Sequence, residues 1–94
     1  MDDKITSEIA SLKNLGPKSA AWLNQAGIYT LQQLQTLGAI EAYRRVIAQG
    51  IKPSLNLLYA LEGAIQNKHW TALDKDEKAS LIMAADALTE EQKP

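Results

Sequence analysis

The sequence predicts an all-α domain, a compact bundle of five or six short helices around a central apolar helix at about residues 54–67. Residues that favour strands are rare, because Phe is absent, Val occurs once, and Trp and Tyr together make up 5% of the chain. Apolar side chains recur every three or four positions, a spacing that places them on one face of a helix. Gly and Pro separate these stretches, at positions where helices commonly begin and end.

The first two helices are predicted near the amino-terminal end. Apolar residues at helical spacing predict one helix over about residues 7–13. The second begins at Pro17, since proline suits the first helical position, where its missing N–H has no partner to lose. It ends near residue 26, because Gly27 suits the left-handed conformation that commonly follows a helix.

The third helix is predicted to begin after Thr30 and to end at Gly38. Thr30 and Gln33 have the spacing of a capping box, in which each side chain accepts a hydrogen bond from the backbone N–H of the other residue. A fourth helix is predicted over residues 39–49, ahead of another glycine.

The fifth predicted helix is the central one. It is apolar almost all round from Leu55 to Ile65, which is typical of a helix surrounded by others. Gly63 costs this helix about 1 kcal/mol relative to Ala, so we expect a close backbone contact at that position. Asp74 and Glu77 predict the start of a sixth helix.

These elements form one predicted domain over residues 12–88. Residues 1–11 are an acidic lead-in that contains the start of the first helix. Residues 89–94 are expected to be a frayed tail, because chain ends are poorly ordered unless they are tied down.

The composition excludes several classes of protein. Cys is absent, which excludes disulfides and thiolate metal sites, and a single His cannot form a zinc site. No apolar stretch approaches the roughly 20 residues that a membrane helix needs, and the acidic start is unlike a signal peptide. We therefore expect a cytoplasmic protein with no metal, no cofactor and no membrane partner.

The charges are unevenly distributed along the chain. The net charge is −1, but residues 12–69 carry six Lys and Arg against two Glu, a net charge of +4. The segments on either side are acidic. Such an asymmetry favours a binding partner over a role in solubility alone.

Residues 12–38 have the pattern of a helix-hairpin-helix motif, in which a Gly-containing turn points backbone N–H groups at a nucleic-acid phosphate. The start of the second helix offers unpaired N–H groups and a partial positive charge, and both favour an anion. Alternatively, the turn is purely architectural. The Asn at position 14 favours that alternative, since binding hairpins usually carry Gly there. The candidate phosphate-binding residues are Asn14, Leu15, Gly16, Lys18 and Ser19.

A second candidate surface, for docking a protein partner, comprises Trp22, Arg44, Arg45 and Lys52. Trp is enriched among the residues that dominate interfaces, and basic side chains complement an acidic surface. Each also has a simpler interpretation: Trp22 as a packing residue, and either Arg as a partner of Glu41 on a solvated helix face.

No catalytic arrangement is recognisable. Glu62 lies on the most apolar helix and His69 precedes Trp70, but no nucleophile, paired carboxylates or nucleotide-binding loop accompanies them. We predict that the chain is not an enzyme and has no small-molecule substrate.

Seven segments together form a longer pattern than the hairpin alone: Leu15–Ser19, Trp22–Leu23, Gly27–Ile28, Leu37–Ala39, Glu41–Tyr43, Ser54–Ala64 and His69–Trp70. This pattern resembles the C-terminal domain of the TfoX/Sxy family of bacterial competence regulators, over about residues 12–85. The resemblance implies a helix-hairpin-helix-like domain that acts as a co-regulator of transcription beside a DNA-bound activator. We therefore expect docking onto a protein of the transcription machinery, with non-specific nucleic-acid binding through the hairpin as the alternative.

Overall fold

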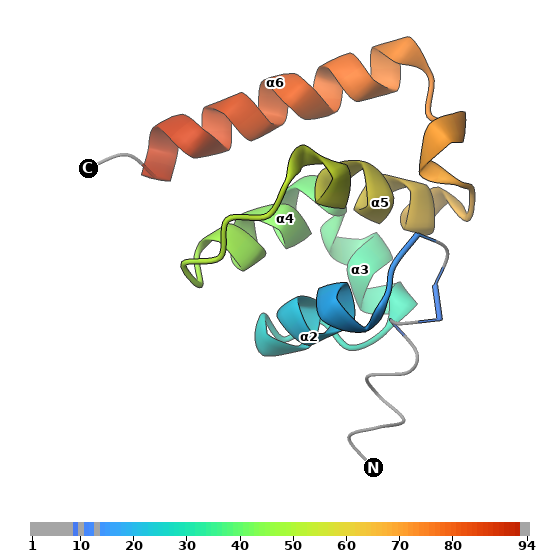
Figure 1. The fold of residues 1–94 in the computed structure, drawn as a ribbon, viewed down its shortest axis with the longest axis vertical. Coiled ribbons are helices and arrows are strands. Elements are labelled where there is room, and N and C mark those ends of the chain that lie inside the picture. Colours follow the sequence, from blue (N-terminus) through green and yellow to red (C-terminus); the bar gives the residue numbers. More distant parts are fainter. Residues whose placement is uncertain (1–8, 10, 13, 93–94) are drawn as a thin grey trace.

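The computed structural model of the chain describes residues 9, 11, 12 and 14–92, with side chains to Leu88. The described residues contain helices and no strand, which confirms the predicted all-α class (Figure 1). The expected helix over residues 7–13 falls largely outside the described residues. The elements are α2 (Pro17–Gln25), α3 (Leu31–Leu37), α4 (Ala39–Ile47), α5 (Leu55–Gln66), the short 3-10 helix η1 (Trp70–Ala72) and α6 (Lys75–Gln92).

Helix α5 is the centre of the bundle, as its all-round apolar character predicts. It packs against α3, α4, η1 and α6, and α4 in turn packs against α2. Helix α6 crosses the bundle on one side, over α4 and α5 (Figure 1). The Cα radius of gyration is 12.6 Å, close to the roughly 12 Å of a compact domain of this length. The largest fully buried side chains are Ile9, Leu23, Ile28, Leu34, Val46, Leu58 and Leu61.

The predicted helix boundaries follow from local capping. The Thr30 Oγ1 accepts a hydrogen bond from the Gln33 N–H at 3.1 Å, and the Gln33 Oε1 accepts one from the Thr30 N–H at 3.1 Å, which confirms the capping box. Gly27 follows α2 with φ of +86°, a left-handed conformation that glycine adopts without strain. Helix α4 ends at Ile47, two residues before the predicted end.

Helix α6 begins with a second reciprocal cap. The Glu77 N–H donates to Asp74 Oδ1 at 2.8 Å, and the Asp74 N–H donates to Glu77 Oε1 at 2.9 Å. The helix extends to Gln92, so residues 89–92 are helical where a frayed tail is expected from the sequence. Neither Gly nor Pro interrupts the chain between the cap and Pro94, which explains the greater length. Within the described residues, no helix is long and apolar enough to span a membrane.

Candidate functional site

The hairpin turn contains a residue with a left-handed backbone. Asn14 has φ of +75°, in the left-handed region that Asn tolerates better than most residues. Leu15 is buried in the core, and Gly16 is the extended residue that precedes Pro17 at the start of α2. Asn14 therefore preserves the conformation that a Gly would adopt at this position.

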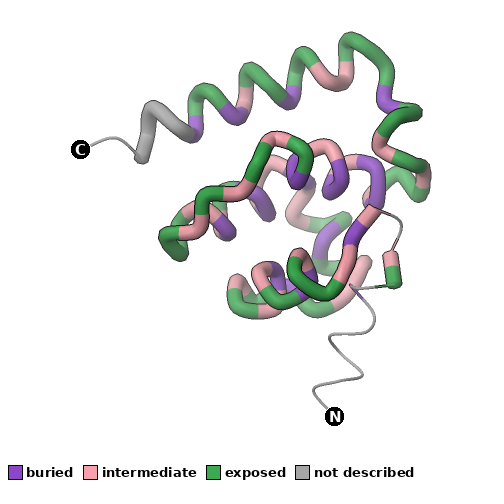
Figure 2. The backbone as a smooth tube through the Cα atoms, in the orientation of Figure 1, coloured by how far each residue is buried: buried purple, intermediate pink, exposed green. Residues whose placement is uncertain are grey.

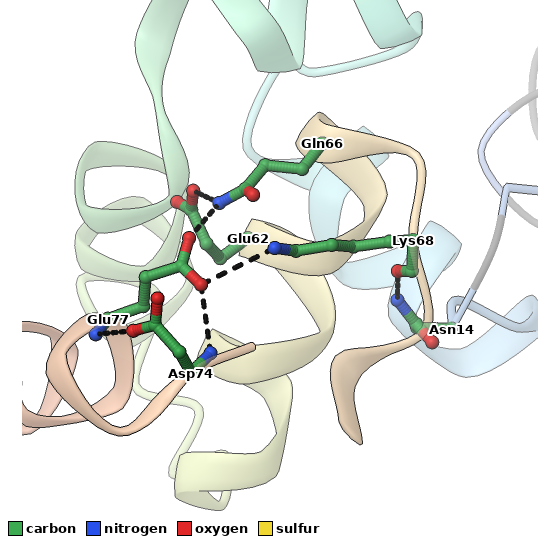
Figure 3. Close-up of polar contacts among 6 residues, drawn as sticks. All are labelled: Asn14, Glu62, Gln66, Lys68, Asp74 and Glu77. Atoms are coloured by element: carbon green, nitrogen blue, oxygen red, sulfur yellow. Dashed lines mark hydrogen bonds and ion pairs between the residues drawn. The ribbon is translucent and has the colours of Figure 1, made fainter. Parts of the chain in front are cut away.

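The Asn14 side chain joins the turn to a distant part of the chain. Its Nδ2 donates to the carbonyl oxygen of Lys68 at 2.9 Å (Figure 3), and its Oδ1 accepts from the Trp70 N–H at 3.1 Å. These contacts lie against Gly63, where a Cβ atom would be 2.8 Å from the Lys68 carbonyl oxygen and would overlap the Asn14 Nδ2. The close backbone contact expected at Gly63 is confirmed, and it explains why this central helix tolerates a Gly.

The hairpin borders an open groove of about 250 Å³ between the first two turns of α2 and of α5. The groove brings three of the five phosphate-binding candidates together with Trp22 from the predicted docking surface. The N-cap and first two turns of α5 supply the rest of the lining, a contribution that no spacing in the sequence indicates. The lining residues are Asn14, Lys18, Ser19, Trp22, Ser54, Asn56, Leu57 and Ala60.

The electrostatic character of this groove favours a negatively charged group. The Lys18 ammonium lies 5.3 Å from the centre of the Trp22 ring, a cation–π contact that holds the cation beside the groove. Gly16 and Ser54, the N-cap residues of α2 and α5, provide no side-chain cap to their helices. The partial positive charge of both helix starts therefore adds to that of Lys18.

The other three residues of the predicted docking surface lie apart from the groove. Arg44 Nη2 and Arg45 Nε contact the Glu41 Oε2 at 2.6 and 3.0 Å, which confirms the expected pairing on the helix face. Hydrogen bonds from Arg44, and then from Arg45, lower the pKa of the Glu41 carboxyl to about 2. Arg45 borders a different groove, beside α3, and Lys52 is exposed in the segment between α4 and α5.

A polar network that the sequence does not reveal connects the hairpin region to α6 (Figure 3). The Lys68 ammonium lies 3.4 Å from Glu77 Oε1, and the Gln66 amide donates to Glu62 and, at 2.9 Å, to Glu77. The Asp74 N–H, then Gln66 and Lys68, lower the pKa of the Glu77 carboxyl. The Asp74–Glu77 spacing predicts the cap, but nothing in the sequence pairs Glu77 with Lys68.

An aromatic cluster reinforces the same junction. The Tyr59 and Trp70 rings stack with centroids 6.3 Å apart, and the Lys78 ammonium lies 5.9 and 5.7 Å from their centroids. His69 caps η1, because its Nδ1 accepts the Thr71 N–H at 3.3 Å. Among the described residues, no group of His, Asp or Glu side chains is arranged to hold a metal ion.

Comparison with known proteins places this geometry in a family. The model of the TfoX C-terminal domain matches residues 5–85, which confirms the resemblance seen in the sequence. Two crystal structures from Listeria monocytogenes are also similar. One, described as an uncharacterized protein, has a TM-score of 0.82 and 33% identity, and the alignment covers 86% of this chain and 92% of that one. The other, described as a protein of unknown function, has a TM-score of 0.80 and 34% identity, with coverage of 84% and 98%. No curated protein matches the chain.

Proposed function

Because the chain belongs to the TfoX C-terminal domain family, we propose that it acts without catalysis, as a co-regulator of transcription linked to competence for DNA uptake. In this proposal it docks onto a protein of the transcription machinery. The docking surface is the groove between α2 and α5, and Lys18 and Trp22 are its principal contacts.

The single observation that carries the proposal is the pairing of one cation with one aromatic ring in the groove. A Lys held over a Trp face presents a localised charge beside an apolar surface. This combination suits an acidic side chain on a folded partner, whose neighbouring apolar atoms can contact the ring.

The same observation makes a nucleic-acid duplex a poorer fit. Proteins that bind DNA through its backbone commonly neutralise several phosphates. Lys18 is the one cationic side chain among the described residues that line the groove, and Arg44 and Arg45 are both engaged by Glu41. The basic character of residues 12–69 therefore does not form a continuous track through this groove.

Non-specific nucleic-acid binding remains the second candidate function, on one observation. The N–H groups of Lys18 and Ser19 lie in the first turn of α2, beside the groove, and donate to no backbone acceptor among the described residues. A single phosphate oxygen could accept from them. This function would use the groove of the docking proposal, so salt dependence separates the two.

The docking proposal is tested in cells that carry this gene, with substitutions introduced at its own locus. Lys18→Glu reverses the charge beside the groove, and we expect transcripts of competence genes to fall at least severalfold while the level of the protein stays unchanged. Gln25→Glu is the matched control, because this exposed residue is on the same helix but does not line the groove. Unchanged transcript levels in the Lys18→Glu strain would show that the groove is not the docking surface.

A further inference from the structure

Helix α6 has an outward face that the described part of the chain leaves uncovered. Leu81, Ala85 and Leu88 face the bundle and are buried. Ile82 is 39% exposed and Met83 is 72% exposed, the largest exposed fraction of any large apolar side chain in the described residues. Figure 2 shows this division along the helix, where single buried residues alternate with exposed and intermediate ones.

One stripe on this face has an apolar middle and charged ends. We call it the α6 stripe, and its residues are Lys75, Ala79, Ile82 and Asp86. They are four, three and four positions apart, so they follow one line along the helix. All four are exposed. Neither Lys75 nor Asp86 takes part in an ion pair with any residue that the structure describes.

We infer that the α6 stripe binds the same stripe of a second copy of this chain, with the two helices antiparallel. If a twofold axis passes near residues 80 and 81, Lys75 faces the partner's Asp86 and Ala79 faces the partner's Ile82. The symmetry repeats each contact. The two Lys75–Asp86 ion pairs then lie on either side of a central contact. There the small Ala79 of each copy packs against the larger Ile82 of the other, as side chains do where two helices interdigitate.

The charges select this orientation over the parallel one. In a parallel pair, the Lys75 side chains of the two copies would face each other, and so would the Asp86 side chains. Like charges in direct opposition disfavour an arrangement, and interhelical ion pairs set the orientation of paired helices. Because one helix of about 27 Å supplies the whole contact, the interface is at the small end for specific association. The dimer is therefore weak, and it forms as the protein concentration rises.

Sedimentation velocity of the intact chain over a range of concentrations, at low salt, tests this inference. The sedimentation coefficient of the wild type is expected to rise with concentration. Lys75→Glu alone, or Asp86→Lys alone, replaces two attractive pairs with two repulsive ones and is expected to weaken association roughly tenfold or more. The double variant K75E/D86K exchanges the two charges, and we expect it to associate like the wild type.

Lys52→Glu is the matched control for Lys75→Glu, since it makes the same change of charge at an exposed site away from α6. It is expected to leave association unaltered. Three results would overturn the inference: a wild-type chain that is monomeric at every concentration, single reversals that associate like the wild type, or a double variant that fails to recover association. A recovered double variant would also show that the single substitutions act through charge, because unfolding is not reversed by a second reversal of charge.

Discussion

Asn14 and Gly63 form the contact on which the hairpin depends. Asn14 adopts a left-handed conformation and its side chain binds the backbone of Lys68 and Trp70. That approach is possible only because position 63 lacks a Cβ atom. The two residues are 49 positions apart in the sequence. The absence of a side chain at Gly63 makes room for the Asn14 side chain, and that contact accounts for a Gly in the middle of a helix.

Gly63→Ala tests this contact directly. The added Cβ would overlap the Asn14 side chain and lie 2.8 Å from the Lys68 carbonyl oxygen, so we expect a loss of about 1–3 kcal/mol in the free energy of unfolding. Gly16→Ala is the comparison variant: its Cβ enters open space on an extended backbone, so its cost is limited to the poorer N-cap that Ala makes, about 1 kcal/mol or less. Urea unfolding of both variants measures the difference. Equal stability of the two variants would show that the close packing is unimportant.

Substitutions of Asn14 separate its two roles. Asn14→Gly keeps the left-handed backbone but leaves the Lys68 carbonyl and the Trp70 N–H without this partner, at a cost of about 1–3 kcal/mol. Asn14→Ala has the same loss and adds about 1–2 kcal/mol of backbone strain. We therefore expect the thermal unfolding temperature to be highest in the wild type, lower in Asn14→Gly and lowest in Asn14→Ala. An Ala variant as stable as the Gly variant would contradict the backbone role.

At the level of the elements, the helices differ in what stabilises their starts. Helix α3 has seven residues, too few to be stable alone in water, and it starts with the reciprocal Thr30 and Gln33 hydrogen bonds. Helix α5 starts at Ser54 without a side-chain cap, and six of its 12 residues are buried, so its stability comes from packing. The two helices therefore respond differently to loss of the N-cap hydroxyl.

Thr30→Ala is expected to lower the free energy of unfolding by about 1 kcal/mol, the usual effect of removing an N-cap side chain. Ser54→Ala removes a hydroxyl that makes no capping bond, so a change of less than about 0.5 kcal/mol is expected. Chemical denaturation of the two variants gives the comparison. A larger loss in Ser54→Ala than in Thr30→Ala would contradict the assignment of the caps.

The junction between α5 and α6 makes stability depend on pH. The folded state lowers the pKa of the Glu77 carboxyl from its ordinary value near 4.5. This stabilisation is complete well above that value and is lost as the pH falls through the lower, folded-state pKa. We expect a smaller loss of stability on acidification in Glu77→Gln than in the wild type, measured by urea unfolding at neutral and at acidic pH. Identical pH profiles would show that the Glu77 contacts do not contribute.

Across the whole molecule, the sequence predicts the features that depend on residues close together in the chain, such as helix ends and the burial of one helix. The ends of α2 and α3 follow from Pro17, Gly27 and the Thr30 cap, and the central position of α5 follows from its composition. The Ser54–Ala64 and His69–Trp70 segments, on which the family resemblance depends, prove to supply core residues, the Gly63 contact and the aromatic stack.

The long-range contacts could not be predicted in this way. The contacts of Asn14 with Lys68 and Trp70 span 54 and 56 positions, and no spacing rule connects residues so distant in a helical chain. For the same reason, the sequence predicts the groove only in part. Lys18 and Trp22 lie one helical turn apart on the same helix and are both candidates from the sequence, whereas the lining from α5 depends on how two helices pack.

Titration of a short random-sequence DNA duplex with the intact chain, followed by fluorescence anisotropy, tests the central claim that the groove docks a protein and does not bind nucleic acid. We expect weak or no binding at low salt, with no further loss in Lys18→Glu. Tight binding that weakens steeply as salt is raised, and that disappears in Lys18→Glu, would contradict protein docking and make phosphate binding the function of the hairpin.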